Sequence, residues 1–196
     1  DIDLLMGGSP CQGFSSSGHH TNFDHIQSQL LYEYERIRNE VRPMYVLLEN
    51  VTMKSVCVDV ITEMMQGTHG VKVYNVNSSG YICQNRQRLY WTNIRYDPTN
   101  IQTTHPLTLA EFIGEGYEGV LMREFGKYGN DGDKFIPDRV IAQCITKNRY
   151  KHNSSYRFNG VKTHYTIEQM ERLQTLPVGY TQPAGSNTQR SYAIGN

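Results

Sequence analysis

A cysteine and a glutamate each follow a short apolar run of this chain, and together they point to covalent chemistry. Cys11 lies in the segment GGSPCQGFS, directly after an apolar run at residues 2–6. Glu49 follows a second apolar run, at residues 45–48. If both runs are parallel strands, the two side chains meet at the carboxyl edge of one sheet, where open α/β folds place their chemistry. A thiolate there can add covalently to a ring that the neighbouring carboxyl group activates.

The elements that would position these residues follow the order of a doubly wound α/β fold. The pattern predicts strands at 1–6, 45–48, 71–76 and 88–94. Apolar residues recur at helical spacing between these runs, over 24–42 and from 56 to about 67. Pro43 ends the first of these two helical patterns, because the residue before a proline disfavours helical backbone.

The texture of the sequence changes at about Tyr96. Residues 97–163 are rich in Gly, Asn, Asp and Thr and show little long-range periodicity, whereas 166–174 is again helical in pattern. We therefore expect a partial catalytic core at 1–96, a small irregular lobe at 97–163, and a return to the core at 164–196.

The composition restricts the partners and the compartment. The 19 Lys and Arg balance 19 Asp and Glu, so overall charge does not indicate a polyanion partner. Residues 139–162 nevertheless hold six basic residues and no acidic one, interleaved with aromatics. That pattern suits a nucleic-acid backbone and its bases, and a solvated loop is the alternative.

The four cysteines lack the spacing of a zinc site or a disulfide framework, so we expect no metal. No apolar run approaches the length of a membrane span. A reducing intracellular compartment is expected, because a catalytic thiol must stay free.

Three later segments extend the pattern that Cys11 and Glu49 begin. They are Gln84-Asn85-Arg86-Gln87-Arg88, then Thr166 to Gln174 followed by Pro177, and Tyr192-Ala193-Ile194-Gly195-Asn196. With these segments in this order the chain resembles the cytosine-C5 DNA methyltransferases. The resemblance implies an S-adenosylmethionine-dependent methyltransferase core of Rossmann-like α/β type, with the 97–163 lobe recognising the target.

The resemblance assigns three catalytic roles. Cys11 would add to C6 of a cytosine, Glu49 would hydrogen-bond or protonate the ring at N3, and Arg88 would contact the base near O2. Arg86 and Arg88 alternate on a predicted strand and would share a face. The resemblance implies that Arg86 helps to bind the phosphate backbone. Taken singly, these residues also fit an inert core cysteine, a strand-end helix cap and an exposed arginine stripe.

The remaining predicted site residues surround the nucleophile or the DNA. Ser9, Gln12 and Ser15 belong to the loop that would close over an extruded base, although a plain surface loop explains the serines equally well. Asn50 would hold the local turn, and we place it among the residues that bind the DNA substrate. Arg149 and Lys151 would contact the double-stranded DNA.

The resemblance also implies S-adenosylmethionine as methyl donor. Pro10, Leu30 and Asn196 match positions that line the donor pocket in this family. The family's Phe-x-Gly-x-Gly loop, which normally precedes the Pro-Cys segment, is not found here. Either this is an excerpt of a longer enzyme, which we favour, or a second chain supplies the first strands.

Two other interpretations remain open. The substrate would be a structured RNA such as tRNA in one of them, although the Cys-Phe-Thr tripeptide of the tRNA branch is not found here. In the other, the chain would be a catalytically silent DNA-binding accessory subunit, which leaves the joint presence of Cys11, Glu49 and Arg88 without a chemical reason. The sequence does not distinguish restriction–modification from gene regulation.

Overall fold

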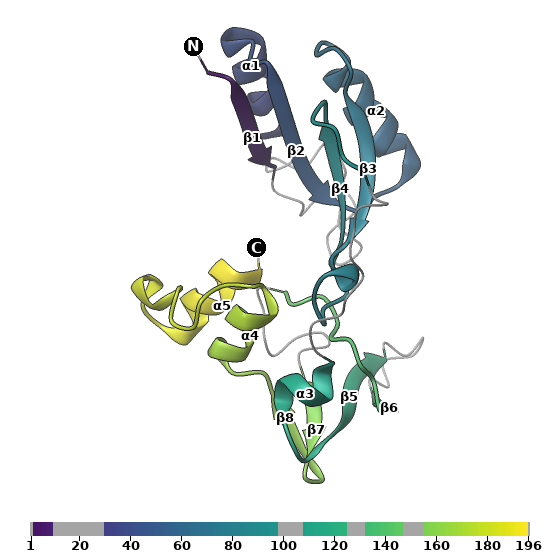
Figure 1. Ribbon diagram of the computed structural model, residues 1–196, viewed down its shortest axis with the longest axis vertical. Coiled ribbons are helices and arrows are strands. Elements are labelled where there is room, and N and C mark those ends of the chain that lie inside the picture. Colours follow the sequence, from purple (N-terminus) through teal and green to yellow (C-terminus); the bar gives the residue numbers. More distant parts are fainter. Residues whose placement is uncertain (1, 10–29, 98–107, 125–131, 147–154, 196) are drawn as a thin grey trace. The chain divides into compact units, whose positions relative to one another are not determined.

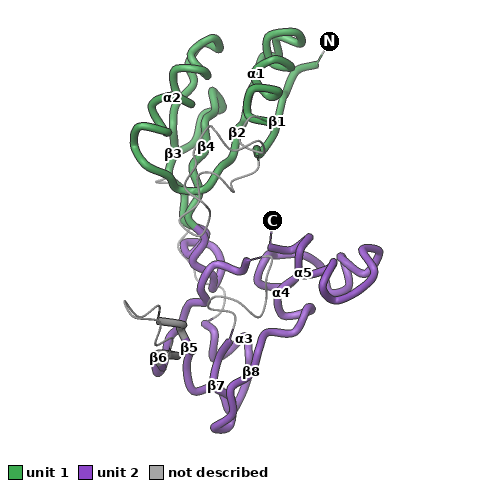
Figure 2. Tube along the Cα trace, turned by 180° about the vertical axis from the view of Figure 1, so that it is seen from behind, with its two compact units in different colours: residues 1–77, 87–100 green, residues 78–86, 101–196 purple. Residues whose placement is uncertain are grey.

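The computed structural model describes residues 2–9, 30–97, 108–124, 132–146 and 155–195. The chain forms two compact units, shown in Figure 2. Unit 1 comprises residues 1–77 and 87–100, and unit 2 comprises 78–86 and 101–196. The 164–196 segment therefore packs within the same unit as the lobe, and its predicted return to the catalytic core stays a prediction.

A four-stranded mixed sheet forms the frame of unit 1. Its strands are β1 (Leu4–Gly8), β2 (Tyr45–Val51), β3 (Lys72–Asn77) and β4 (Gln87–Thr92), in the order β1-β2-β4-β3. β1 and β2 are parallel, as the sequence predicts, so their carboxyl ends meet at one edge. β4 is antiparallel to both of its neighbours, which makes the sheet mixed.

Two helices, α1 (Leu30–Val41) and α2 (Ser55–Met65), pack on this sheet. One buried cluster joins Leu31 of α1 and Ile61 of α2 to Leu48 of β2 and Trp91 of β4. Both helices therefore cover the same face of the sheet, as two right-handed crossovers in the same direction require (Figure 1). The predicted helices are confirmed over these ranges, while 24–29 lie outside the described residues.

Unit 2 contains a second sheet, which is antiparallel throughout. Its strands are β5 (Tyr117–Glu124), β6 (Gly132–Pro137), β7 (Ser155–Phe158) and β8 (Val161–His164), in the order β6-β5-β7-β8. The prediction of an irregular lobe is wrong here. The alternating pattern of these strands is weak in the sequence, because β7 and β8 span four residues each and the β5–β7 register shifts between Tyr117 and Gly119.

Gly119 shows why that register shift is possible. Its φ is +147°, and a Cβ atom there would lie 2.3 Å from the carbonyl oxygen of Ile136 on the paired strand β6. Only glycine tolerates both the backbone conformation and the close approach.

The described part of unit 2 also contains the α-helices α3 (Leu109–Ile113), α4 (Ile167–Leu173) and α5 (Asn187–Gly195). Their apolar residues share one buried cluster with the sheet, including Leu109, Val120, Tyr156, Met170 and Ile194. Thr108 and Thr166 each begin a helix with a reciprocal capping box, so α3 and α4 start at defined residues. Within the described ranges, no helix is long and apolar enough to cross a membrane.

Candidate active site at the carboxyl end of β2

An ion pair between Glu49 and Arg88 marks the carboxyl end of β2. The antiparallel register of β2 and β4 pairs Val51 with Arg88, so Glu49 and Arg88 lie two residues apart on the same face. Nε of Arg88 lies 2.9 Å from Oε1 of Glu49, and the side chains are 14% and 33% exposed. β2 continues to Val51, so Glu49 belongs to the strand itself, where its backbone is fixed by the sheet.

The neighbouring strand leaves room for this carboxylate because it ends in two glycines. Gly8 of β1 is the register partner of Glu49, and a Cβ atom at Gly8 would lie 3.1 Å from Oε2 of Glu49. A Cβ atom at Gly7 would lie 2.8 Å from the ring of Tyr34 on α1. Gly7 and Gly8 are not among the predicted site residues, and their signal in the sequence is a glycine pair at a strand end, immediately before the predicted nucleophile loop.

Tyr34 ties α1 to the same strand. Its hydroxyl donates to the carbonyl oxygen of Leu5 at 3.2 Å. Burial raises the pKa of Tyr34 to about 12, so the hydroxyl remains a donor at neutral pH. The ring and the hydroxyl together fix the distance between α1 and β1.

Asn50 joins the ends of the two parallel strands. Its side chain is buried, and Nδ2 donates to Oγ of Ser9 at 2.9 Å. Its Oδ1 accepts from the backbone N–H of Val51 at 2.8 Å. The predicted role of Asn50 in DNA binding stays a prediction. Its burial favours a positioning role, because the amide reaches Ser9 two residues before Cys11.

The predicted strand begins one residue later than Arg86, so Arg86 is not part of β4, and the shared face of Arg86 and Arg88 stays a prediction. β4 begins at Gln87, and Arg86 precedes it in the 78–86 segment of unit 2. There Nη1 of Arg86 lies 3.6 Å from Sγ of Cys144. The reason is that the backbone of 83–85 pairs with Ala142 before the chain enters β4.

The other predicted site residues are placed only in part. Leu30 is the first residue of α1 and is 50% exposed. Pro10, Cys11, Gln12, Ser15, Arg149, Lys151 and Asn196 lie outside the described residues. In the portions of the chain that are described, no cluster of three or more His, Cys, Asp or Glu side chains could hold a metal ion.

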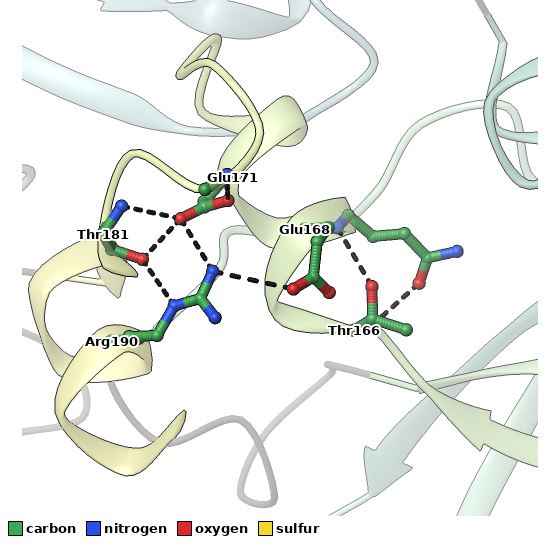
Figure 3. A network of polar contacts seen from close by, with 7 residues as sticks. Thr166, Glu168, Glu171, Thr181 and Arg190 are labelled. Carbon is green, nitrogen blue, oxygen red and sulfur yellow. Dashed lines mark hydrogen bonds and ion pairs between the residues drawn. The ribbon is translucent and has the colours of Figure 1, made fainter. Parts of the chain in front are cut away.

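A buried carboxylate holds α5, whose last residue precedes Asn196. Glu171 of α4 is fully buried and accepts hydrogen bonds from the N–H of Gly179, from the N–H and hydroxyl of Thr181, and from Arg190 of α5. Arg190 also faces Glu168 at 3.6 Å (Figure 3). Burial alone would raise the pKa of Glu171, but the hydrogen bonds from Thr181, Gly179 and Arg190 outweigh it and lower the pKa to about 2.

Comparison with known proteins identifies the family of this chain. The family described as C-5 cytosine-specific DNA methylase matches residues 1–196. The chain belongs to this family. This chain is 34% identical to the orphan methyltransferase M.SPRI of Bacillus phage SPR, in an alignment that covers 95% of this chain and 45% of that protein.

Two further relatives agree with this assignment. The type II methyltransferase M1.ScrFI of Lactococcus lactis subsp. cremoris is 35% identical over 92% of this chain and 46% of its own length. The type II methyltransferase M.HhaI of Haemophilus parahaemolyticus is 32% identical over 58% of this chain and 37% of its own length. The chain thus spans less than half the length of M.SPRI and M1.ScrFI.

Proposed function

We propose that this chain carries the catalytic residues of an enzyme that methylates C5 of a flipped-out cytosine in double-stranded DNA. The observation that carries the proposal is the Glu49–Arg88 ion pair at the carboxyl end of β2, beside the strand that leads into Cys11. Membership of the methylase family supports it.

The proposed nucleophile follows closely on a fixed residue. Ser9 is held by Asn50, and two residues later comes Cys11. Covalent geometry alone keeps the Cα atoms of residues 9 and 11 within about 7 Å of each other. The thiolate would add to C6 of the ring, and the C5–C6 electrons would then make C5 nucleophilic. Loss of the C5 proton and expulsion of the Cys11 sulfur restore the aromatic ring at the end of the reaction.

Glu49 and Arg88 would handle the charge that this addition creates. A carboxyl group at N3 withdraws electron density from the ring, which lowers the barrier for attack at C6. The guanidinium of Arg88 remains beside the carboxylate and can donate to the O2 position. Because both side chains project from paired strands, little reorganisation is needed when the base arrives.

S-adenosylmethionine, when bound, supplies the electrophilic methyl group. Pro10, Leu30 and Asn196 would line its pocket. Leu30 fits this role as a half-exposed apolar residue in the first turn of α1, but it offers no partner for the ribose or the amino-acid moiety. Those partners would come from a further segment or a second chain. Exposed Leu4 and Met6 on the edge strand β1, with exposed Ile2 just before it, support packing of such a segment there.

Unit 2 would recognise the DNA target. Its sheet presents Arg157 over the ring of Phe135, with the guanidinium carbon 4.1 Å from the ring centre and the side chain 39% exposed. Arg149 and Lys151 would add phosphate contacts from the segment between β6 and β7. A DNA substrate also implies an intracellular location, in the cytoplasm, nucleoid or nucleus.

Covalent trapping tests the proposal. A duplex that carries 5-fluorocytosine cannot lose a proton from C5, so the enzyme should remain bonded to the base after methyl transfer. With methyl donor and any completing segment present, we expect a stable adduct whose peptide mass places the bond at Cys11, and none with Cys11→Ala. An active preparation that gives no adduct at Cys11 contradicts the mechanism. Labelled methyl incorporation into tRNA and not into duplex DNA would instead identify an RNA substrate.

A further inference from the structure

Gln84 is buried, and its side chain supports the end of a helix. None of its surface is exposed, and its Nε2 donates to the carbonyl oxygen of Leu173 at 2.9 Å. Leu173 is the last residue of α4, and the final carbonyl groups of a helix have no partner within the helix. Gln84 therefore supplies a donor to α4 from a segment far away in the sequence.

Burial of the Gln84 amide in the core has a free-energy cost. Its Oε1 is buried without a hydrogen-bond partner among the described residues. A buried polar atom without a partner destabilises a fold, and an apolar side chain of similar length would avoid that cost. Packing alone therefore does not explain why an amide is present at this position. The hydrogen bonds of the neighbouring backbone suggest another role for it.

The backbone around Gln84 is fastened at both sides. The N–H of Ala142 donates to the carbonyl oxygen of Cys83 at 2.7 Å, and the N–H of Asn85 donates to the carbonyl oxygen of Ala142 at 2.8 Å. The hydroxyl of Ser78 donates to the carbonyl oxygen of Gln84 at 2.7 Å. With the bond to Leu173, four hydrogen bonds hold residues 83–85 in unit 2.

Arg86 follows this fastened segment directly. Its guanidinium lies beside Cys144, two residues along the chain from Ala142. We propose that Gln84 is a positioning residue that sets Arg86 for a DNA phosphate. This inference rests on the proposed function and on the phosphate contact that the family resemblance implies for Arg86. Loss of the Gln84 amide would release the segment from α4 and let the Arg86 backbone shift.

A double-mutant cycle separates this role from simple packing. The variants are Gln84→Met, which keeps the length and removes the amide, Arg86→Ala, and their combination. The measurement is the Kd for a target duplex over a range of salt concentrations, with folding of each variant checked by circular dichroism. Arg86→Ala should reduce the slope of log Kd against log salt by about one, as expected for one lost phosphate contact.

Gln84→Met should weaken DNA binding in the same direction, and the double variant should bind no more weakly than Arg86→Ala alone. Gln174→Met is the matched control, because Nε2 of Gln174 also donates to a backbone carbonyl, that of Ile194 at 3.3 Å, without any link to Arg86. The control should leave the DNA affinity and its salt slope unchanged. Ser78→Ala, which removes only the bond to the Gln84 carbonyl, repeats the cycle if Gln84→Met does not fold.

The outcomes are distinct. Additive losses in the double variant overturn the inference, as does wild-type DNA affinity in folded Gln84→Met when Arg86→Ala binds weakly. Wild-type affinity in Arg86→Ala shows instead that the phosphate role proposed for Arg86 is wrong, and the role of Gln84 then falls with it. Non-additive losses of DNA affinity support the inference.

Discussion

Replacement of Glu171 by glutamine should destabilise unit 2 strongly, because this carboxylate has no exposed surface and accepts four hydrogen bonds. Its Oε1 accepts from the N–H and hydroxyl of Thr181 and from Arg190, and its Oε2 accepts from the N–H of Gly179 at 2.6 Å. A glutamine can place its carbonyl oxygen at the position of Oε1. Its NH2 group then faces the N–H of Gly179, donor against donor.

The structure gives the size of this effect. One charge-assisted hydrogen bond is lost, which costs about 1.5–3 kcal/mol. The guanidinium of Arg190, whose side chain is 11% exposed, also loses its buried counter-charge. Together these losses amount to about 3 kcal/mol, at the lower end of what breaking a buried ion pair costs. For a chain of this size the melting temperature should fall by about 6–12 °C.

Glu168→Gln is the matched control, because Glu168 lies on the same helix and faces the same Arg190 at 3.6 Å. Its side chain is 49% exposed, so the loss should be at most about 1 kcal/mol. Urea unfolding followed by circular dichroism measures both variants, and hydrogen exchange should show faster opening of α4 and α5 in Glu171→Gln. Equal unfolding midpoints for the two variants would refute the reasoning.

The acid dependence of stability provides a second measure of the same network. The pKa of Glu171 in the folded protein is about 2, below its ordinary value of 4.5. The stability that ionised Glu171 contributes is therefore fully present above pH 4.5 and is lost as the pH falls toward about 2. Glu171→Gln should unfold with a weaker dependence on pH across this window, whereas Glu168→Gln should retain the wild-type dependence.

Three further substitutions test other parts of the two units. Gly8→Ala should slow methyl transfer at least tenfold with little change in DNA Kd, because the new methyl group crowds the Glu49 carboxylate. Single-turnover kinetics measure the rate of methyl transfer. An unchanged rate would show that the carboxylate can move aside freely. Tyr165→Phe should leave stability unchanged or raise it by about 1 kcal/mol in urea unfolding, since the hydroxyl it removes is buried without a hydrogen-bond partner among the described residues. Asn50→Leu should lower stability by about 1–3 kcal/mol and reduce the yield of the Cys11 adduct, because Ser9 loses its donor; full trapping would remove the positioning role.

The parallel pairing of β1 and β2 could be predicted because both strands are short apolar runs and Pro43 separates the second from the preceding helix. The helices α1 and α2 could also be predicted from the spacing of their apolar residues, since each helix buries one apolar stripe against the sheet. The local apolar pattern determines these elements, so the sequence alone was sufficient to predict them.

The sheet of unit 2 could not be predicted in the same way. β7 and β8 are too short to establish an alternating pattern, and the bulge near Gly119 shifts the alternation within β5. Burial in this sheet depends on α3 and α4, whose apolar residues share one buried cluster with it. The pattern is therefore a consequence of tertiary packing and is weak in the sequence itself.

The roles of Gly8 and Asn50 were hidden for a different reason. Each acts across the two parallel strands, Gly8 by leaving space for Glu49 and Asn50 by holding Ser9. Such relations depend on the register of β1 against β2, and a one-residue shift would exchange the faces. The register therefore determines which of the predicted site residues in the described ranges touch, and spacing along the sequence does not reveal it.

The segment from Gln84 to Arg88 shows how spacing can mislead. Its alternating arginines match the period of a strand, yet β4 begins only at Gln87, and the residues before it belong to unit 2. The side chain of Gln84 donates a hydrogen bond to the last residue of α4, whereas that of Arg88 forms an ion pair with Glu49. The spacing of this segment therefore reflects the passage of the chain from unit 2 into unit 1. An insertion between Gln84 and Gln87 would disturb Arg86 while leaving the register of Arg88 in β4 intact. Such a variant would separate the phosphate contact proposed for Arg86 from the base contact proposed for Arg88.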